Sequence, residues 1–365
     1  RDYYASRGLG DVYKRQVLIN DATRENIWHI KFARMFDMSN DSHLFYTYSQ
    51  LVDKGAKLEG NKFLLNNQFY VPLYEGKMIW HYNHHFGTIN EGTKEKPARQ
   101  MAMPTSDELK NPNHNIMPWY WIPKEDMDNR LIKTDAKGNI IWEWSHKWLI
   151  GFRDITNATH DRTFVISLIP DACGVGHSAT LLFVERGTMP GALLLGMMSS
   201  LVFDYATRQK IGGSHASISF VKQFPVLTPE QVSSSGYEQD IVERVARLCW
   251  FNHDLDGWME ELREECPEEY DLPEEPVIWD EEQRTVWQAE LDAIFAHLYG
   301  LTTEDLRYIL DPEDVCGKGC INETFRVLKE RELRELGEYR TKRLVMEAWN
   351  KFEFDNKLKM LCYEK

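Results

Sequence analysis

The segment at residues 191–227, GALLLGMMSSLVFDYATRQKIGGSHASISFVKQFPVL, contains the change of pattern that decides the fold. Apolar side chains recur at helical spacing between Leu195 and Tyr205, which predicts one helix over residues 191–208. A Gly-Gly pair then predicts a turn, and the alternation at residues 217–221 predicts a strand. A helix, a tight turn and a strand in close succession are typical of a mixed α+β domain.

The chain before this segment is predicted to be mixed in secondary structure. A helix is expected at residues 21–35, where Ile27 and Ile30 lie near helical spacing. The polar stretch 91–113 carries three prolines and is expected to be a long loop. Alternating or continuous apolar runs predict five strands, at residues 69–71, 78–82, 140–144, 147–155 and 163–169. The first of these is expected to end at Pro72, because proline has no N–H to donate.

The pattern becomes helical after Pro229, and a domain boundary is expected near that position. Asp280, followed three residues later by Gln283, predicts the capped start of a helix that Gly300 ends. Thr302 predicts the cap of the next helix. The expected fold is therefore a mixed α+β domain followed by a mainly α-helical C-terminal region.

Charge divides the chain at the same place. Residues 1–230 hold 26 Lys+Arg and 24 Asp+Glu, a net charge of +2, whereas residues 231–365 hold 17 and 33, a net charge of -16. Such asymmetry indicates different roles for the two regions. The C-terminal region is expected to be acidic and helical, and to brace the first region or to contact another protein.

The composition excludes several classes of protein. The 365 residues are 42% hydrophobic and include 12 Trp, which is enough apolar side chain for packed cores. The longest nearly apolar run, residues 191–203, is shorter than the roughly 20 residues of a membrane span, so no membrane partner is expected. Six Cys are too few for a disulfide scaffold, and we expect a cytoplasmic protein.

The first sixteen residues are left out of the fold prediction. Residues 7–16, RGLGDVYKRQ, resemble translated sequencing-adapter sequence, and residues 1–16 lack the periodicity of a helix or a strand. A non-native leader at 1–16 implies that the chain is the C-terminal part of a longer protein.

Three short motifs lack part of the residue set that their chemistry needs. Residues 165–176 end in Asp-Ala-Cys-Gly-Val-Gly, like a loop that binds S-adenosylmethionine (SAM), but no ribose-binding carboxylate follows roughly 20 residues later. Glu75 and Lys77 have no second carboxylate upstream to hold Mg²⁺. Cys316 and Cys320 supply only two of the four ligands of a zinc site. We therefore expect structural roles for all three motifs, and assign neither a catalytic residue nor a metal ligand.

His81, His84 and His85 are the closest group of histidines in the chain. No acidic ligand accompanies them at a fixed spacing. We therefore expect half-buried histidines, or histidines that face phosphate, rather than metal ligands.

Basic and polar side chains gather at the turns between the apolar elements. Arg and Lys can pair with guanine edges and Gln with adenine, and Arg, Lys and Ser also hold phosphates. The expected DNA-binding residues are Arg153, Asn157, Arg162, Arg208, Gln209, Lys210, Ser214 and His215. Replacement of Arg208 or Lys210 by alanine is expected to weaken DNA binding and to leave folding intact.

Several stretches resemble the C-terminal half of large adenine-specific DNA methyltransferases, which occur in restriction–modification systems and in the BREX and DISARM phage-defence systems. The stretches are FARMFDMSNDS (32–42), PLYEGKMI (72–79), GFRDITN (151–157), FDYATRQKIGG (203–213), QFPVL (223–227), ETFRVL (323–328) and GEYRTKRL (337–344). Together they extend over most of the chain.

The resemblance implies a division of labour with a domain that precedes this region in the family. Residues 17–70 would be the end of the methyltransferase region or a connector, residues 71–230 the target recognition domain, and residues 231–365 the acidic helical extension. The chain would read double-stranded DNA and hold no cofactor itself. The parent enzyme would use SAM to methylate adenine at N6. The catalytic Asn-Pro-Pro-Tyr loop of the family is missing, because all 14 prolines are isolated. Further expected partners are the upstream methyltransferase domain and subunits of a defence system.

Two other functions remain open on the sequence alone. The chain could be a small intact nuclease or methyltransferase that uses Glu75 and Lys77, or the glycine turn at 174–176. It could also be a protein-interaction module of a defence complex.

Overall fold

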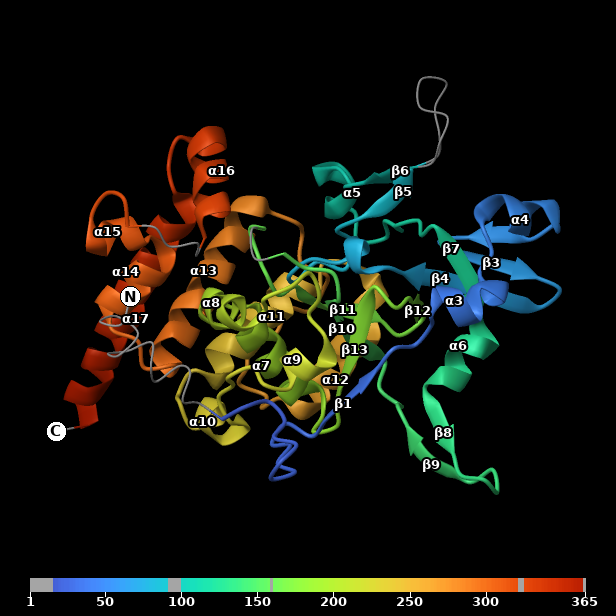
Figure 1. The fold of residues 1–365 in the computed structure, drawn as a ribbon, viewed down its shortest axis with the longest axis horizontal. Helices are drawn as coiled ribbons and strands as arrows, with labels where there is room; N and C mark the ends of the chain where they lie inside the picture. The colour runs from blue at the N-terminus through green and yellow to red at the C-terminus, as the bar shows by residue number, and fades with distance from the viewer. Residues whose placement is uncertain (1–15, 91–99, 158–159, 321–324, 364–365) are drawn as a thin grey trace.

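A four-stranded antiparallel sheet lies near the middle of the structure (Figure 1). The structure is a computed structural model, and it describes residues 16–90, 100–157, 160–320 and 325–363. Its strands are, in order, β1 (Ile30–Ala33), β13 (Ala179–Val184), β10 (Trp148–Arg153) and β11 (Ile166–Pro170). Every residue of β11 and β13 is buried, which explains their nearly continuous apolar sequence. The strands predicted at 147–155 and 163–169 are confirmed.

A second sheet forms around a long strand whose sequence contains a proline. Its members are β2 (Lys57–Glu59), β3 (Lys62–Leu65), β4 (Gln68–Tyr74), β7 (Tyr120–Pro123) and β12 (Gly174–Val175). The prediction that the strand ends at Pro72 is wrong, because β4 continues to Tyr74. Pro72 faces Trp121 of β7 on one edge, and on the other edge it falls between the residues paired with β3 and those paired with β12. The missing N–H of the proline therefore interrupts no ladder.

The helix predicted at residues 21–35 is wrong. Arg24 and His29 have φ angles of 61° and 50°, in the left-handed region that a right-handed helix excludes. The side chain of Asn20 accepts hydrogen bonds from two backbone N–H groups of the turn that replaces the helix. Only β1 is a regular element in this range.

The polar stretch 91–113 is partly regular, which corrects the prediction of one long loop. β6 (Gln100–Ala102) pairs with β5 (Thr88–Asn90), and α5 (Ser106–Lys110) follows. The helix begins at Thr105, whose hydroxyl and backbone N–H form a capping box with Glu108. Residues 91–99 lie outside the described residues.

Short elements complete the first half of the chain. They are α3 (Met38–Asp41), η1 (Ser42–Leu44), α4 (Tyr48–Asp53), η2 (Gly76–Met78), α6 (Lys124–Arg130), β8 (Ile132–Thr134) and β9 (Ile140–Glu143). β9 confirms the strand predicted at 140–144. The strand predicted at 78–82 is wrong, because η2 leads into a tight loop where Tyr82 has a φ of 57°.

The single helix predicted over residues 191–208 is two helices, α7 (Thr188–Ser199) and α8 (Leu201–Lys210), bent by 65° relative to each other. The break is at Ser200, whose hydroxyl accepts from the N–H of Phe203 and caps α8. The N–H of Leu201 donates to the buried Asp292 at 2.7 Å. A cap and a buried acceptor therefore start a new helix where the apolar pattern runs on.

The segment after α8 also differs from the prediction. Residues 217–221, expected as a strand, form the short helix α9 (Ile218–Val221), in which the N–H of Val221 donates to the carbonyl of Ser217. The extended residues around Pro225 then pair with Val17, and α10 (Pro229–Ser233) begins at a Thr228 capping box.

The C-terminal region is helical, as predicted. Its elements are α11 (Glu238–Cys249), η3 (His253–Leu255), α12 (Asp256–Glu265), α13 (Glu281–Leu298), α14 (Thr303–Leu310), α15 (Pro312–Cys316), α16 (Arg326–Leu336) and α17 (Arg340–Tyr363). The side chains of Asp280 and Thr302 cap α13 and α14, which confirms both predicted starts. Helices α13 to α17 gather at one end of the molecule, and the sheet around β3 and β4 lies towards the other (Figure 1).

One hydrophobic core continues across residue 230. α11 and α12 pack against α7, and α13 packs against α8 and α11. At Gly196 of α7, a Cβ would lie 3.2 Å from Val245 and 3.3 Å from Ile241, so these helices are in close contact. The expected boundary near residue 230 is thus a change of composition without a break in packing.

Among the described residues, no single helix is long and apolar enough to cross a membrane. α7 and α8 reach that length and apolar character only when taken together, and they are bent by 65°.

Candidate nucleic-acid interface

Two loops that are distant in sequence lie side by side and form the most exposed of the predicted binding regions. One follows β10 at residues 154–157, and the other follows α8 at residues 211–216. The N–H of Thr156 donates to the carbonyl of Ser214 at 2.9 Å, and the N–H of Ala216 donates to the carbonyl of Asp154 at 2.7 Å. These bonds hold the loops antiparallel, as a short bridge.

The Gly-Gly turn of the second loop is uncovered. A Cβ built at Gly212 or Gly213 would have no heavy atom within 4 Å, and the neighbouring Ser214 and His215 are exposed. A bare backbone beside exposed donors allows close approach of a ligand surface. Four of the predicted DNA-binding residues are exposed around this turn: Asn157, Gln209, Ser214 and His215.

Asp154 organises two basic side chains of this surface. Its carboxylate lies 2.8 Å from Nδ1 of His215 and 3.6 Å from a guanidinium nitrogen of Arg34. The side chain of His215 is 59% exposed and that of Arg34 is 50% exposed, so both can reach a ligand. Sequence reasoning missed Arg34 as a site residue, because nothing local relates it to a turn more than a hundred residues away.

Arg153, predicted to contact DNA, instead holds a neighbouring loop. Its guanidinium donates to the carbonyls of Gly76 at 2.8 Å and Ile79 at 2.6 Å. It also lies over the rings of Trp80 and Phe86, with its Cζ at 4.8 and 5.3 Å from their centroids. Burial lowers the pKa of Arg153 to about 10. Its donors face the protein, which leaves little of this side chain for DNA.

Arg208 and Arg162, also predicted to contact DNA, share the buried carboxylate of Asp204. Arg208 Nε lies 3.1 Å from Asp204 Oδ2, and Arg162 Nε lies 3.5 Å from it. Asp204 also accepts hydrogen bonds from the backbone N–H groups of Thr163 and Phe164. The side chain of Arg208 is only 4% exposed, which leaves little of it for contact with a phosphate or a base. Its guanidinium closes the loop before β11.

Lys210 is intermediate in exposure between the exposed residues around the Gly-Gly turn and the buried arginines. It is half-buried, and its ammonium donates to the carbonyl of Gln223. Burial lowers its pKa. Its contact with DNA stays a prediction, as do those of Asn157, Gln209, Ser214 and His215.

In the structure, residues of the three incomplete motifs lie in a strand, in a local ion pair and at the end of a helix. Residues 171–176 run into β12, which pairs with β4, and the Cys173 thiol donates to the carbonyl of Pro170 at 2.9 Å. Glu75 and Lys77 pair with each other at 3.1 Å. Cys316 is the last residue of α15 and is exposed. The residues directly after Cys320 lie outside the described residues.

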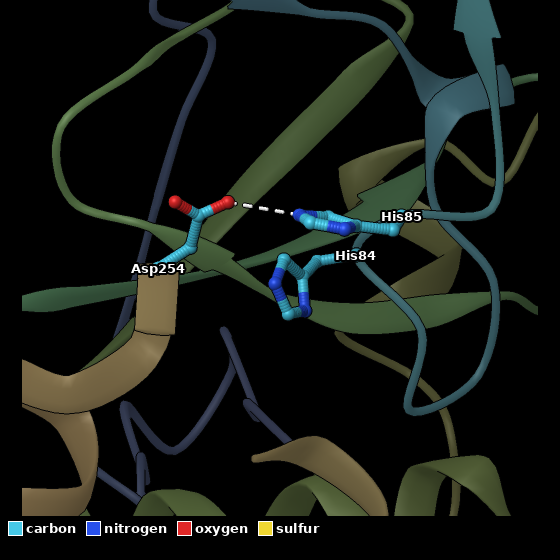
Figure 2. A group of neighbouring side chains, drawn as sticks. All are labelled: His84, His85 and Asp254. Atoms are coloured by element: carbon cyan, nitrogen blue, oxygen red, sulfur yellow. Dashed lines mark hydrogen bonds and ion pairs between the residues drawn. The ribbon is translucent and has the colours of Figure 1, made fainter. Parts of the chain in front are cut away.

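The histidines at 81, 84 and 85 are buried, which corrects the expectation of half-buried or phosphate-facing side chains. Their exposed fractions are 3%, 1% and 0%. Burial lowers the pKa of His81 and of His84 well below the ordinary value, so both are neutral imidazoles. Nε2 of His85 lies 2.8 Å from the Asp254 carboxylate, with the ring of His84 next to this pair (Figure 2). Imidazole and carboxylate are metal-binding groups, and within the described residues His84, His85 and Asp254 lie close enough together to hold a metal.

A cavity of about 550 Å³ lies between the loop that carries His81 and His85 and the helices α13, α16 and α17. Its lining includes His81, Arg162, Arg284 and Asp292. Burial raises the pKa of Asp292 to about 7. The cavity is large enough for a small ligand, and its charged lining is balanced in sign.

Comparison with known proteins assigns no class. No protein-family model matches the chain, and no curated protein matches it. A functional proposal therefore depends on the sequence stretches described above and on the geometry of the two loops.

Proposed function

We propose that this chain is the DNA-recognition segment of an N6-adenine DNA methyltransferase of a restriction–modification or phage-defence system. We further propose that the paired loops 154–157 and 211–216 contact double-stranded DNA. The observation that carries the proposal is the uncovered Gly212–Gly213 turn, which is held against the first loop and surrounded by exposed donors.

The chemistry of this surface suits a duplex. The bare turn lets backbone N–H groups approach phosphates without steric hindrance. Gln209 and Asn157 carry the amide groups that pair with adenine, while His215 and Arg34 supply donors for phosphate or guanine. Asp154 holds the side chains of His215 and Arg34 in position, which lowers the entropy lost on binding.

The remaining steps of the reaction belong to other parts of the parent enzyme. Its SAM domain would flip and methylate the target adenine, and this chain would select the sequence. The net charge of -16 on residues 231–365 disfavours contact with phosphates. This helical region is therefore expected to contact the catalytic domain or a defence-system subunit.

Selection from a pool of random DNA duplexes tests the proposal with the chain as it is. We expect one enriched motif that contains an adenine, and an affinity that falls as salt rises, measured by fluorescence anisotropy. If no motif is enriched and no salt-dependent binding is seen, the proposal is wrong. Capture of a defence-system subunit by a chain that ignores DNA would favour an interaction module.

A further inference from the structure

We propose that His84, His85 and Asp254 form a binding site for a divalent transition metal of the zinc class. One ligand atom from each side chain lies within 4.8 Å of the other two. Figure 2 shows the His85 ring and the Asp254 carboxylate facing each other, with the His84 ring beside them. Two imidazoles and one carboxylate are the protein ligands of a common type of zinc site that keeps a fourth position open.

One imidazole nitrogen of this cluster is buried without a hydrogen-bond partner. Nε2 of His84 has no such partner within the described residues, and the side chain is 99% buried. A buried polar atom without a partner costs free energy, so such an atom marks a place where a ligand can bind. Its presence in the cluster with His85 and the Asp254 carboxylate is the second observation that points to a metal.

The backbone fixes both histidines before any metal arrives. Trp80 and Asn83 exchange two backbone hydrogen bonds, at 2.8 and 3.0 Å, across a loop in which Tyr82 is left-handed. The side chain of Asn83 then accepts from the N–H of His85 at 2.9 Å. This tight loop presents two consecutive imidazoles to the same neighbour, and such preorganisation favours binding.

The carboxylate is held in the same manner from the other side. Asp254 lies in η3, where the side chain of Asn252 accepts from its backbone N–H at 2.9 Å. In a tetrahedral site with bonds of about 2.1 Å, the His85 nitrogen and the Asp254 oxygen would be roughly 3.4 Å apart. Their present separation is 2.8 Å, so a small movement admits the ion.

The fourth position is expected to be water from an adjoining cavity. Asp254 borders a cavity of about 310 Å³, together with Tyr74 and Cys173. The Cys173 thiol already donates to the carbonyl of Pro170, which argues against it as a ligand. The Tyr74 hydroxyl is buried with no partner within the described residues, and it lines the same cavity as Asp254, where it could bond a water molecule.

The metal would join two regions of the chain. His84 and His85 lie in the loop after η2. Asp254 lies in η3, directly before α12, and is 169 residues after His85 in the sequence. A metal with ligands in both segments binds only the folded arrangement, so it would stabilise the contact between the first region and the helical region. This role is independent of DNA recognition.

The experiment is a Co²⁺ titration of the full chain after exposure to a chelator, followed by displacement with Zn²⁺. We expect one Co²⁺ per chain with the strong visible absorption of four-coordinate cobalt, lost on adding Zn²⁺, and a higher melting temperature with either metal. His84→Ala and Asp254→Asn should each weaken Co²⁺ binding by more than about 100-fold, since even outer-shell changes cost 10–100-fold.

A matched control and a folding check complete the test. His253→Ala removes an exposed imidazole next to Asp254 that pairs with Asp256 instead, and it should bind Co²⁺ like the parent. Asp254→Asn is nearly isosteric, so it remains informative if His84→Ala fails to fold by circular dichroism. Metal binding that survives Asp254→Asn and His84→Ala in folded protein, or no binding by the parent, overturns the proposal.

Discussion

Arg208 and Asp204 form an ion pair inside the protein, one turn apart on α8, with Nε 3.1 Å from Oδ2 and side chains that are 4% and 0% exposed. The same guanidinium donates to the carbonyls of His160 and Asp161 and lies over the ring of Phe325. Asp204 also accepts hydrogen bonds from the backbone N–H groups of Thr163 and Phe164, just before β11. The pair therefore joins α8 to the loop before β11 and to the C-terminal region.

We expect Arg208→Ala to destabilise the fold by about 3–5 kcal/mol, because it leaves a buried carboxylate with one partner fewer. Urea unfolding measures this change. Gln209→Ala, at the next and exposed position, should change stability by less than about 0.5 kcal/mol. An Arg208→Ala variant as stable as the parent would contradict the assignment of this arginine to the interior.

His215→Ala should weaken DNA binding without a change in stability. A phosphate contact would lower the salt slope of binding by about 1. A base contact would cost about 1–3 kcal/mol at one position of the motif. Anisotropy across a salt series distinguishes the two, with the exposed His43 replaced by alanine as the control. If His215→Ala and Gln209→Ala both bind like the parent, the recognition surface lies elsewhere.

Asp292 should make the protein less stable as pH rises. Its folded pKa is about 7, raised by burial from an ordinary value near 3.8, so the folded state binds the extra proton between these values. This destabilisation begins above about pH 4 and is complete above about pH 7, at a cost on the order of a few kcal/mol. Urea midpoints at pH 5 and pH 8 should differ less in Asp292→Asn than in the parent. An identical pH dependence in both proteins would assign the effect to another group.

The isolated chain is not expected to bind SAM. Residues 171–176 enter β12 rather than a loop that opens a helix, and the Asn-Pro-Pro-Tyr loop of the family is missing. Calorimetry with SAM is the measurement. Binding at micromolar affinity would favour the alternative of an intact methyltransferase.

Removal of residues 231–365 should expose α7 and cause aggregation. α7 is buried along nearly its whole length, and Val245 and Ile241 of α11 cover its Gly196. Light scattering of the truncated chain tests this expectation. A monomeric, folded fragment of residues 17–230 would show that the core divides at that position.

Local signals predicted the elements that local physics controls. The starts of α13 and α14 follow from Asp280 and Thr302, because a cap needs only the next three residues. The apolar runs of β10 and β11 were recognisable because both strands are buried on both faces. The helix expected at 21–35 failed because its apolar spacing did not reveal the left-handed residues Arg24 and His29.

The sequence indicated only part of the proposed binding surface. The sequence indicated the Gly-Gly turn and its exposed neighbours, and the structure places residues 154–157 beside them. The sequence did not indicate the contacts of Asp154 with His215 and Arg34, or the proximity of Asp254 to His84 and His85. These pairs are separated by 61 to 170 residues, and no periodicity relates residues so far apart.

Arg208 and Gln209 show what each level decides. The sequence by itself determined that two polar side chains end a helix before a glycine turn, and that a helical, acidic region follows, since propensity, capping and charge are properties of neighbouring residues. Only the tertiary structure decided that Arg208 is buried against Asp204 while Gln209 is exposed. Successive residues of a helix point about 100° apart, and the face that is covered depends on segments packed from elsewhere in the chain.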